Sequence, residues 1–155
     1  MTEIIQGERI GKTAPLKVGC SAIIFDTDRQ KVLLTRRADN GKWCVPGGHM
    51  EPGESAAEAC IRETLEETGL LVKVIKLIGI YTSPNRIVRY SDGNVCQPIV
   101  LTFEAVPIDG KLSLSSETID IGYFSLEDML SMEMMPLLLD RICDAFACQE
   151  MAFIR

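Results

Sequence analysis

Histidine is nearly missing from this 155-residue sequence, in which His49 is the only copy. A Ser-His or Cys-His mechanism would therefore have one possible base, and we expect His49 to line a turn rather than to carry chemistry. Paired cysteine motifs are missing too, because none of the six cysteines forms a Cys-x-x-Cys pair and several lie in apolar stretches. This pattern favours reduced, mostly buried thiols over zinc sites or disulfides.

Long apolar runs and an excess of positive charge are also lacking. The apolar runs fall far short of the roughly twenty residues that cross a bilayer, and the first residues, with Glu3 and Glu8, show no signal-peptide pattern. We therefore expect a cytoplasmic protein without a membrane partner. The net charge of −6 argues against long nucleic acids as partners. A small anionic substrate stays compatible, since a metal ion and a few arginines can supply positive charge locally.

The size and composition predict one globular domain over residues 1–155. A chain of this length can bury a substantial core, and 46% hydrophobic with 25% charged residues is ordinary for a soluble protein. We find no internal repeat and no low-complexity segment, so no second domain is needed.

The stretch from Gly47 to Leu70 combines a glycine-rich turn with a helix. Gly47, Gly48 and Gly53 permit close backbone approaches that a side chain would obstruct. Ser55 followed three residues later by Glu58 fits a capping box, and Gly69 fits the end of the helix. About thirteen residues rich in Ala, Glu and Leu lie between these signals. We expect a stripe of this helix to face a sheet, comprising Ala57, Ile61, Thr64 and Thr68 with Cys60 and Leu65 at its margins.

The other side of this predicted helix is acidic. Glu63, Glu66 and Glu67 stand at spacings that make helix neighbours, and such like-charged pairs cost about 0.2–0.5 kcal/mol each in an isolated helix. A divalent cation would make the cluster favourable, and carboxylate oxygens favour Mg²⁺ or Mn²⁺ over softer metals. Glu54 could add a fourth acid. The alternative is a solvated glutamate-rich face, which is common on helices.

Read as a pattern, Gly48, Glu54, Arg62-Glu63, Glu66-Glu67 and Gly69-Leu70 closely resemble the signature box of the Nudix hydrolases. These are pyrophosphohydrolases of nucleoside diphosphates linked to another group. The box covers 23 positions, and each of its fixed residues is present at the correct spacing. One position that is usually aliphatic carries Thr64, which we expect to face the core. The resemblance implies an α/β protein with the Nudix fold, a mixed β-sheet sandwiched between α-helices.

The resemblance also implies roles for the residues of the box. Glu63 and Glu67 correspond to metal ligands, Glu66 to a ligand or a general base, and the Gly48 carbonyl to a further ligand. Arg62 would orient these carboxylates, and Glu54 is a further candidate catalytic acid. Some family members carry another acid just before the aromatic residue of the last strand, where this chain has Gly122. Glu117 and Asp120 are the nearby candidates to replace it.

Strand signals surround the box. We expect residues 16–25 and 31–35 to form a hairpin, and residues 1–14 to form an edge strand or a loose arm. A short strand over Trp43–Pro46 would lead to the glycine turn, with Trp43 covering the core rather than stacking on a base. Further strands are expected at 71–82, 94–106 and 119–124, with an Asp-Gly hairpin turn at 108–111.

The C-terminal part predicts two helices. Ser125 would cap a short helix, with Asp128 three residues later, and a second helix would begin near Pro136. Methionines at positions 129, 132, 134 and 135 supply adaptable packing, or equally a contact in a homodimer.

Candidate substrate contacts lie on both sides of the box. Arg37 ends a predicted strand near the glycine turn and is a candidate phosphate clamp. The polar loop 83–93 carries Arg86, Arg89 and Tyr90, which suit a nucleotide or simply a connector. The substrate would be a small nucleotide, either ADP-ribose-like or a nucleoside triphosphate. The alternative function is a catalytically silent, nucleotide-sensing Nudix-like module.

Overall fold

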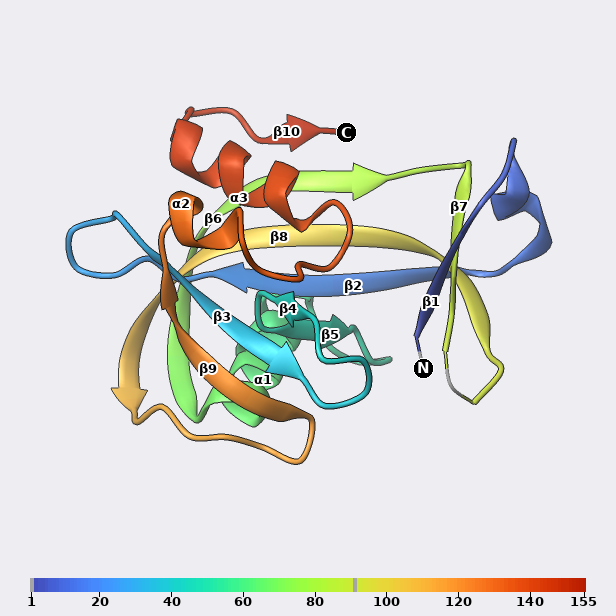
Figure 1. Ribbon diagram of the computed structural model, residues 1–155. Coiled ribbons are helices and arrows are strands. Elements are labelled where there is room, and N and C mark those ends of the chain that lie inside the picture. Colours follow the sequence, from blue (N-terminus) through green and yellow to red (C-terminus); the bar gives the residue numbers. More distant parts are fainter. Residues whose placement is uncertain (1, 91) are drawn as a thin grey trace.

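The computed structural model describes residues 2–90 and 92–155. Its strands form a large mixed sheet and a smaller three-stranded sheet, with the helices packed around them (Figure 1). In chain order the elements are β1 (Glu3–Gln6), the 3₁₀ helix η1 (Ile10–Thr13), β2 (Leu16–Ile23), β3 (Val32–Arg37), β4 (Trp43–Cys44), β5 (Gly47–His49), α1 (Ala56–Thr68), β6 (Leu70–Thr82), β7 (Arg86–Arg89), β8 (Val95–Gly110), β9 (Thr118–Phe124), α2 (Leu126–Met129), α3 (Leu138–Ala147) and β10 (Phe153–Ile154).

The large sheet is built on β2 and β8, which pair in parallel. β5 lies antiparallel to β2 on its other side, and β6 lies antiparallel to β8. β7 and β1 extend the sheet at one end, and β10 pairs in parallel with β6. The small sheet has the order β4-β3-β9. This arrangement confirms the prediction of an α/β protein with a mixed sheet.

The two faces of β2 contact different helices, because successive side chains of a strand point to opposite faces. Ile23 joins the core cluster that contains Leu138 and Ile142 of α3. Its neighbours Ala22 and Ile24 join the cluster that contains residues of α1. The helices α1 and α3 therefore cover opposite faces of the large sheet (Figure 1). β2 is buried on both faces only from Cys20 to Ile23, whereas Leu16 is 62% exposed, so the prediction of a strand buried on both faces holds for the second half of the apolar run.

The predicted hairpin between β2 and β3 is wrong. Its turn forms, since the amide of Asp26 donates to the Lys31 carbonyl at 2.9 Å and Phe25 forms an isolated bridge with Val32. The strands then separate: β2 pairs with β5 and β8, whereas β3 pairs with β4 and β9. Both edges of β2 are already used, so β3 enters the second sheet.

Two other local predictions need correction. The Asp109-Gly110 dipeptide does not turn a hairpin but ends β8, paired with Leu71 and Leu70. The expected polar loop at 83–93 contains the strand β7, and residue 91 lies outside the described residues. By contrast, β1 confirms an edge strand near the N-terminus, paired with β7.

The C-terminal helices agree with the sequence. Ser125 and Asp128 form the predicted capping box of α2, and α3 begins two residues after Pro136. Met129 is buried, and the other three nearby methionines pack against the same core cluster. Trp43 lies in this core as expected. Four of the six cysteines are buried and all are free, while Cys143 and Cys148 are exposed. None of the described helices is long and apolar enough to cross a membrane.

Candidate active site

The caps of α1 set the position of its acidic side chains. The Ser55 hydroxyl accepts the Glu58 amide at 3.3 Å, and the Glu58 carboxylate accepts the Ser55 amide at 2.8 Å. At the other end Gly69 adopts φ 74°, a left-handed conformation that suits glycine. The helix spans the thirteen residues predicted, and its acids face the glycine turn of β5.

The buried stripe of α1 is rotated relative to the prediction. Thr64 and Thr68 are fully buried as expected, but Ala57 and Ile61 are only half-buried and Leu65 is 44% exposed. Glu67 takes the interior position, with 6% of its surface exposed. It is held there because its carboxylate accepts the backbone amide of Gly47 at 3.0 Å.

Gly48 lies directly against the second acid of the site. A Cβ added to Gly48 would collide with the carboxylate of Glu63, so this close approach requires glycine. The glycine turn and the helix therefore meet at Glu63 and Glu67, as the box pattern predicts.

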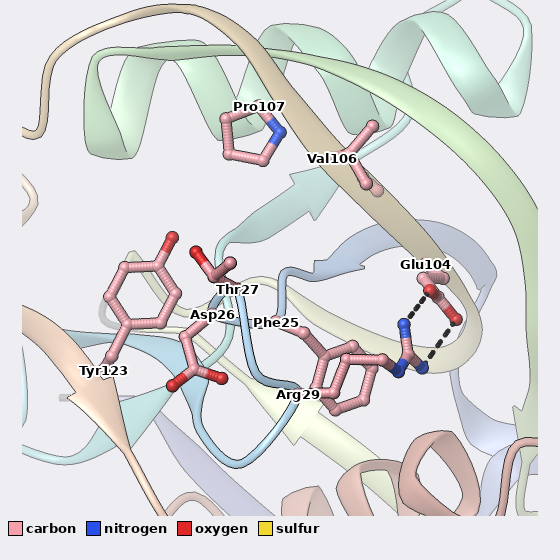
Figure 2. A pocket seen from close by; sticks show the side chains of 9 residues that line it. Phe25, Asp26, Thr27, Arg29, Glu104, Val106, Pro107 and Tyr123 are labelled. Carbon is pink, nitrogen blue, oxygen red and sulfur yellow. Dashed lines mark hydrogen bonds and ion pairs between the residues drawn. The ribbon is translucent and has the colours of Figure 1, made fainter.

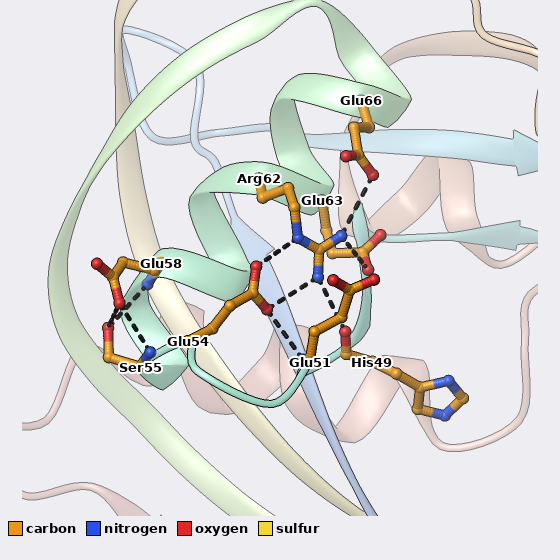
Figure 3. A network of polar contacts seen from close by, with 8 residues as sticks. All are labelled: His49, Glu51, Glu54, Ser55, Glu58, Arg62, Glu63 and Glu66. Carbon is orange, nitrogen blue, oxygen red and sulfur yellow. Dashed lines mark hydrogen bonds and ion pairs between the residues drawn. The ribbon is translucent and has the colours of Figure 1, made fainter.

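Arg62 gathers the remaining acids around one guanidinium (Figure 3). Its Nη1 donates to Glu63 at 2.9 Å and to Glu66 at 3.3 Å, and its Nη2 donates to Glu54 at 3.0 Å. Nη2 also donates to the carbonyl of His49 at 3.0 Å, which ties the helix to β5. Arg62 thus contacts three acids of the box, and its role in orienting them for catalysis stays a prediction.

The acids of this cluster differ in how well their charge is balanced. Hydrogen bonds from Arg62 lower the pKa of Glu54 to about 2. Burial raises the pKa of Glu63 in spite of Arg62. Burial also raises the pKa of Glu67 to about 7, with the charge of Glu63 adding to the effect and the Gly47 amide opposing it. Among these acids, Glu67 is the one whose ionised form is least stabilised by its surroundings.

The donor set fits a hard cation, although the acids do not converge on one point. Within residues 2–90 and 92–155, no three His, Cys, Asp or Glu side chains form a group that could hold a metal ion. Arg62 instead draws Glu54, Glu63 and Glu66 toward itself. The available donors are all oxygens, and two carboxylates have pKa values raised by burial, which a bound cation would lower.

The predicted substrate residues fall at different distances from this cluster. Tyr90 lies beside the box, because its hydroxyl is 2.9 Å from Nε2 of His49. Arg37 is paired with Asp39 at 2.8 Å, and its charge lowers the pKa of Glu67. Arg89 instead pairs with Glu3 at 3.3 Å on the exposed β1–β7 edge. Arg86 is half-buried in β7, with its Nε buried and without a partner among the described residues.

The two candidate late acids are separated by the structure. The charge of Glu117 helps to raise the pKa of both Glu63 and Glu67, so Glu117 lies within electrostatic reach of α1. Asp120 lies in β9 opposite Arg36, and its carboxylate accepts the amide of Ile121. Of the two, Glu117 is the one positioned near the site.

Sequence reasoning missed two backbone contacts of the site. The Gly47 amide and the His49 carbonyl hold Glu67 and Arg62, respectively. The adjacent glycines were a signal for the first contact, whereas no side-chain pattern could indicate the second.

Two cavities contrast in their surroundings. One of about 410 Å³ lies beside α1 and is lined by Gly53, Glu54, Glu58, Ile61, Arg62 and Leu65. Another of about 520 Å³ lies between the β2–β3 turn and β8 (Figure 2), lined by Phe25, Asp26, Thr27, Arg29, Glu104, Ala105, Val106, Pro107 and Tyr123. In the latter, Arg29 is neutralised by Glu104 at 2.6 Å and stacks on Phe25.

Comparison with known proteins identifies the arrangement. The NUDIX domain family model matches residues 15–142. An ADP-ribose pyrophosphatase of Methanocaldococcus jannaschii is 38% identical over 102 residues, covering 64% of this chain and 57% of that protein. A putative 8-oxo-dGTP diphosphatase of Bacillus subtilis is 45% identical over 62 residues, covering 40% of this chain and 42% of that protein. The chain thus spans about half the length of these relatives.

The solved structures agree with the sequence comparison. A NUDIX hydrolase from Nitrosomonas europaea aligns with a TM-score of 0.65 and 31% identity, covering 86% of this chain and 89% of that chain. The mixed sheet between α1 and α3 is therefore the Nudix fold that the box predicted. Because the family match includes the box and extends over most of the sequence, this chain belongs to the Nudix hydrolase family.

Proposed function

We propose that this chain is a metal-dependent pyrophosphohydrolase that cleaves the diphosphate linkage of a nucleoside diphosphate derivative. The observation that carries the proposal is Glu67, a buried carboxylate beside Glu63 at a glycine turn, with a pKa raised to about 7. A scaffold position gains nothing from such a charge, whereas a cation site requires it.

The proposed ligands of Mg²⁺ or Mn²⁺ are Glu63, Glu67 and the Gly48 carbonyl, with Glu66 nearby. A cation held by these oxygens supplies charge neutralisation at phosphate oxygens and makes water more acidic. Glu66 is suited to accept the proton of the attacking water, because its side chain is 59% exposed and contacts Arg62 only at 3.3 Å. Arg62 and Glu54 would keep the acids oriented through their paired hydrogen bonds.

Contacts with the substrate are proposed for residues around the box. Tyr90 has geometric support because it contacts His49, and Arg37 has electrostatic support because its charge lowers the pKa of Glu67. Arg86 and Arg89 remain predictions without a contact that links them to the box. The names of the relatives favour a small nucleotide, either ADP-ribose-like or a nucleoside triphosphate.

The direct test is product release from a panel containing ADP-ribose and nucleoside triphosphates, with Mg²⁺, with Mn²⁺ and with excess chelator. We expect hydrolysis of at least one compound with a cation and none with chelator. Nucleotide binding without any turnover would instead support the silent sensing module. Turnover that persists fully in chelator would overturn the metal requirement.

A further inference from the structure

Arg141 is a partly buried arginine of α3 that the box pattern does not include. It lies between the buried residues Leu138 and Ile142, on the side of α3 that packs on the large sheet. Its Nη1 donates to the hydroxyl of Ser21 in β2, over a long distance of 3.4 Å. The guanidinium therefore extends from the helix to the sheet rather than into open solvent.

No carboxylate balances this guanidinium among the described residues. The nearest acid along the helix face is Asp144, which accepts from Arg155 at 2.8 Å through both oxygens and from Tyr81 at 2.9 Å. Burial lowers the pKa of Arg141, and the groups that oppose this effect are Cys44 and Tyr81, with no carboxylate among them. By contrast, the partly buried Arg37 and Arg62 each have carboxylate partners. A partly buried positive charge with one weak hydrogen bond is costly unless an anion or an acceptor joins it.

Through Ser21, Arg141 contacts the β2–β5 strand pair, which also binds Glu67. Ser21 is the register partner of Gly47, whose amide binds Glu67. His49 lies two residues after Gly47 in β5, so the side chains of His49 and Ser21 leave the sheet on the same face. This is the face that α3 covers, and Tyr90 contacts His49 on it. Arg141 and Tyr90 therefore flank the end of the β2–β5 pair on a common face.

We propose that Arg141 is a substrate-binding residue of this site and that its guanidinium takes paired acceptor atoms of the nucleotide. The inference rests on the proposed function and names a further residue that contacts the substrate. A guanidinium presents a planar fork of donors that matches two neighbouring acceptors. Such acceptors occur on a phosphate group and on the guanine edge that carries O6 and N7, whereas adenine presents one acceptor and one donor there.

The first measurement compares the parent with Arg141→Met and Arg141→Lys, using ADP-ribose, ATP and GTP. Binding is measured by calorimetry in excess chelator, and KM and kcat are measured with Mg²⁺. We expect Arg141→Met to weaken binding and raise KM by about 10- to 100-fold, the loss typical of a hydrogen bond to a charged group, with a smaller change in kcat. A loss shared by all three nucleotides, largely restored by Arg141→Lys, assigns the contact to phosphate. A loss confined to GTP, with poor restoration by lysine, assigns it to the base edge.

Arg29→Met is the matched control, because Arg29 is ion-paired in the distant cavity and has no place in the site. Thermal melts check that each variant is folded, and Arg141→Lys keeps the charge if methionine impairs folding. An Arg141→Met protein that is folded and keeps the parental affinity and KM overturns the inference. So does an equal rise in KM for Arg29→Met, or a parent that binds none of the three nucleotides. A parent that binds them without turnover contradicts the proposed hydrolysis, while the affinities in chelator still decide the role of Arg141.

Discussion

Arg29 and Arg62 each hold carboxylates, but the two clusters have opposite charge balances. Arg29 meets the single acid Glu104, and Lys76 lies 3.9 Å from the same carboxylate. Arg62 meets the three acids Glu54, Glu63 and Glu66, and Glu67 lies beyond its hydrogen bonds. The Arg29 cluster is thus complete without a ligand, whereas the Arg62 cluster has more negative charge than its arginine can balance.

The charge balance of a cluster distinguishes a structural ion pair from a candidate active site better than the volume of the nearby cavity does. The cavity at Arg29 is the larger of the two that we describe, yet its Arg29 and Glu104 are already paired with each other. The excess carboxylate around Arg62 costs stability in the absence of a cation and supplies ligands in its presence. Substitutions in one cluster should therefore change turnover, and substitutions in the other should change only stability.

The largest effect is expected for Glu67→Gln. Turnover should fall by at least about 100-fold, because the amide is a poor replacement for an anionic ligand at a reacting centre. In excess chelator the variant should be as stable as the parent or more stable, since a buried charge has been removed. Turnover assays and thermal melts of both proteins measure these two outcomes. A variant with near-parental turnover would show that Glu67 is a structural residue and not a metal ligand.

The same pair of proteins should differ in the pH dependence of stability. The pKa of Glu67 is raised from 4.5 to about 7 in the folded state. Its favourable contribution to the free energy of unfolding is therefore present below about pH 4.5. This contribution, about 3 kcal/mol, is lost as the pH rises through about 7. Denaturant unfolding of the parent in chelator should show this loss between these pH values, and Glu67→Gln should lack it. Parallel pH profiles for the two proteins would contradict the assignment.

Added Mg²⁺ or Mn²⁺ should stabilise the parent, because a ligand that binds only the folded state stabilises it by mass action. At a cation concentration of about 100 times Kd, the gain is about 2.7 kcal/mol, and a rise in melting temperature measures it. Glu67→Gln should gain less. Glu104→Gln serves as the control and should gain as much as the parent, because its acid lies in the cluster that is already balanced. Equal gains in all three proteins would place cation binding elsewhere.

Glu104→Gln should lower stability by about 1 kcal/mol and leave kcat and KM unchanged. The change removes the charge partner of Arg29, whose side chain is 44% exposed and can therefore regain water. Chemical denaturation and a turnover assay measure the two quantities. A loss of turnover at constant stability would make the far cavity part of the active site.

The features predicted correctly from sequence have local causes. The caps of α1 and α2 depend on residues three positions apart, so Ser55 with Glu58 and Ser125 with Asp128 were readable directly. The acidic cluster was readable for the same reason, because helix periodicity fixes which glutamates are neighbours.

The errors arose where distant segments compete for the same edge or face. The apolar run of β2 fits a hairpin with β3 as well as it fits a central strand, and only the parallel pairing with β8 decides between them. The rotation of α1 depends on the Gly47 amide, which draws Glu67 inward. Arg141 was missed because its meaning appears only when α3 packs on Ser21, 120 positions away in the sequence.

The smallest effects are expected for the two candidate substrate residues that are adjacent in the sequence, Arg89 and Tyr90. Tyr90→Phe removes the hydroxyl that lies 2.9 Å from His49, and should raise KM by about 3- to 10-fold, as the loss of one neutral hydrogen bond does. Arg89→Ala should change KM less than about twofold, because its partner Glu3 is exposed and surface ion pairs contribute little. Steady-state kinetics on the best substrate compare the two variants. Since Tyr90 contacts β5 while Arg89 contacts β1, a larger effect at Arg89 would mean that the substrate extends along the outer edge of the sheet rather than over His49.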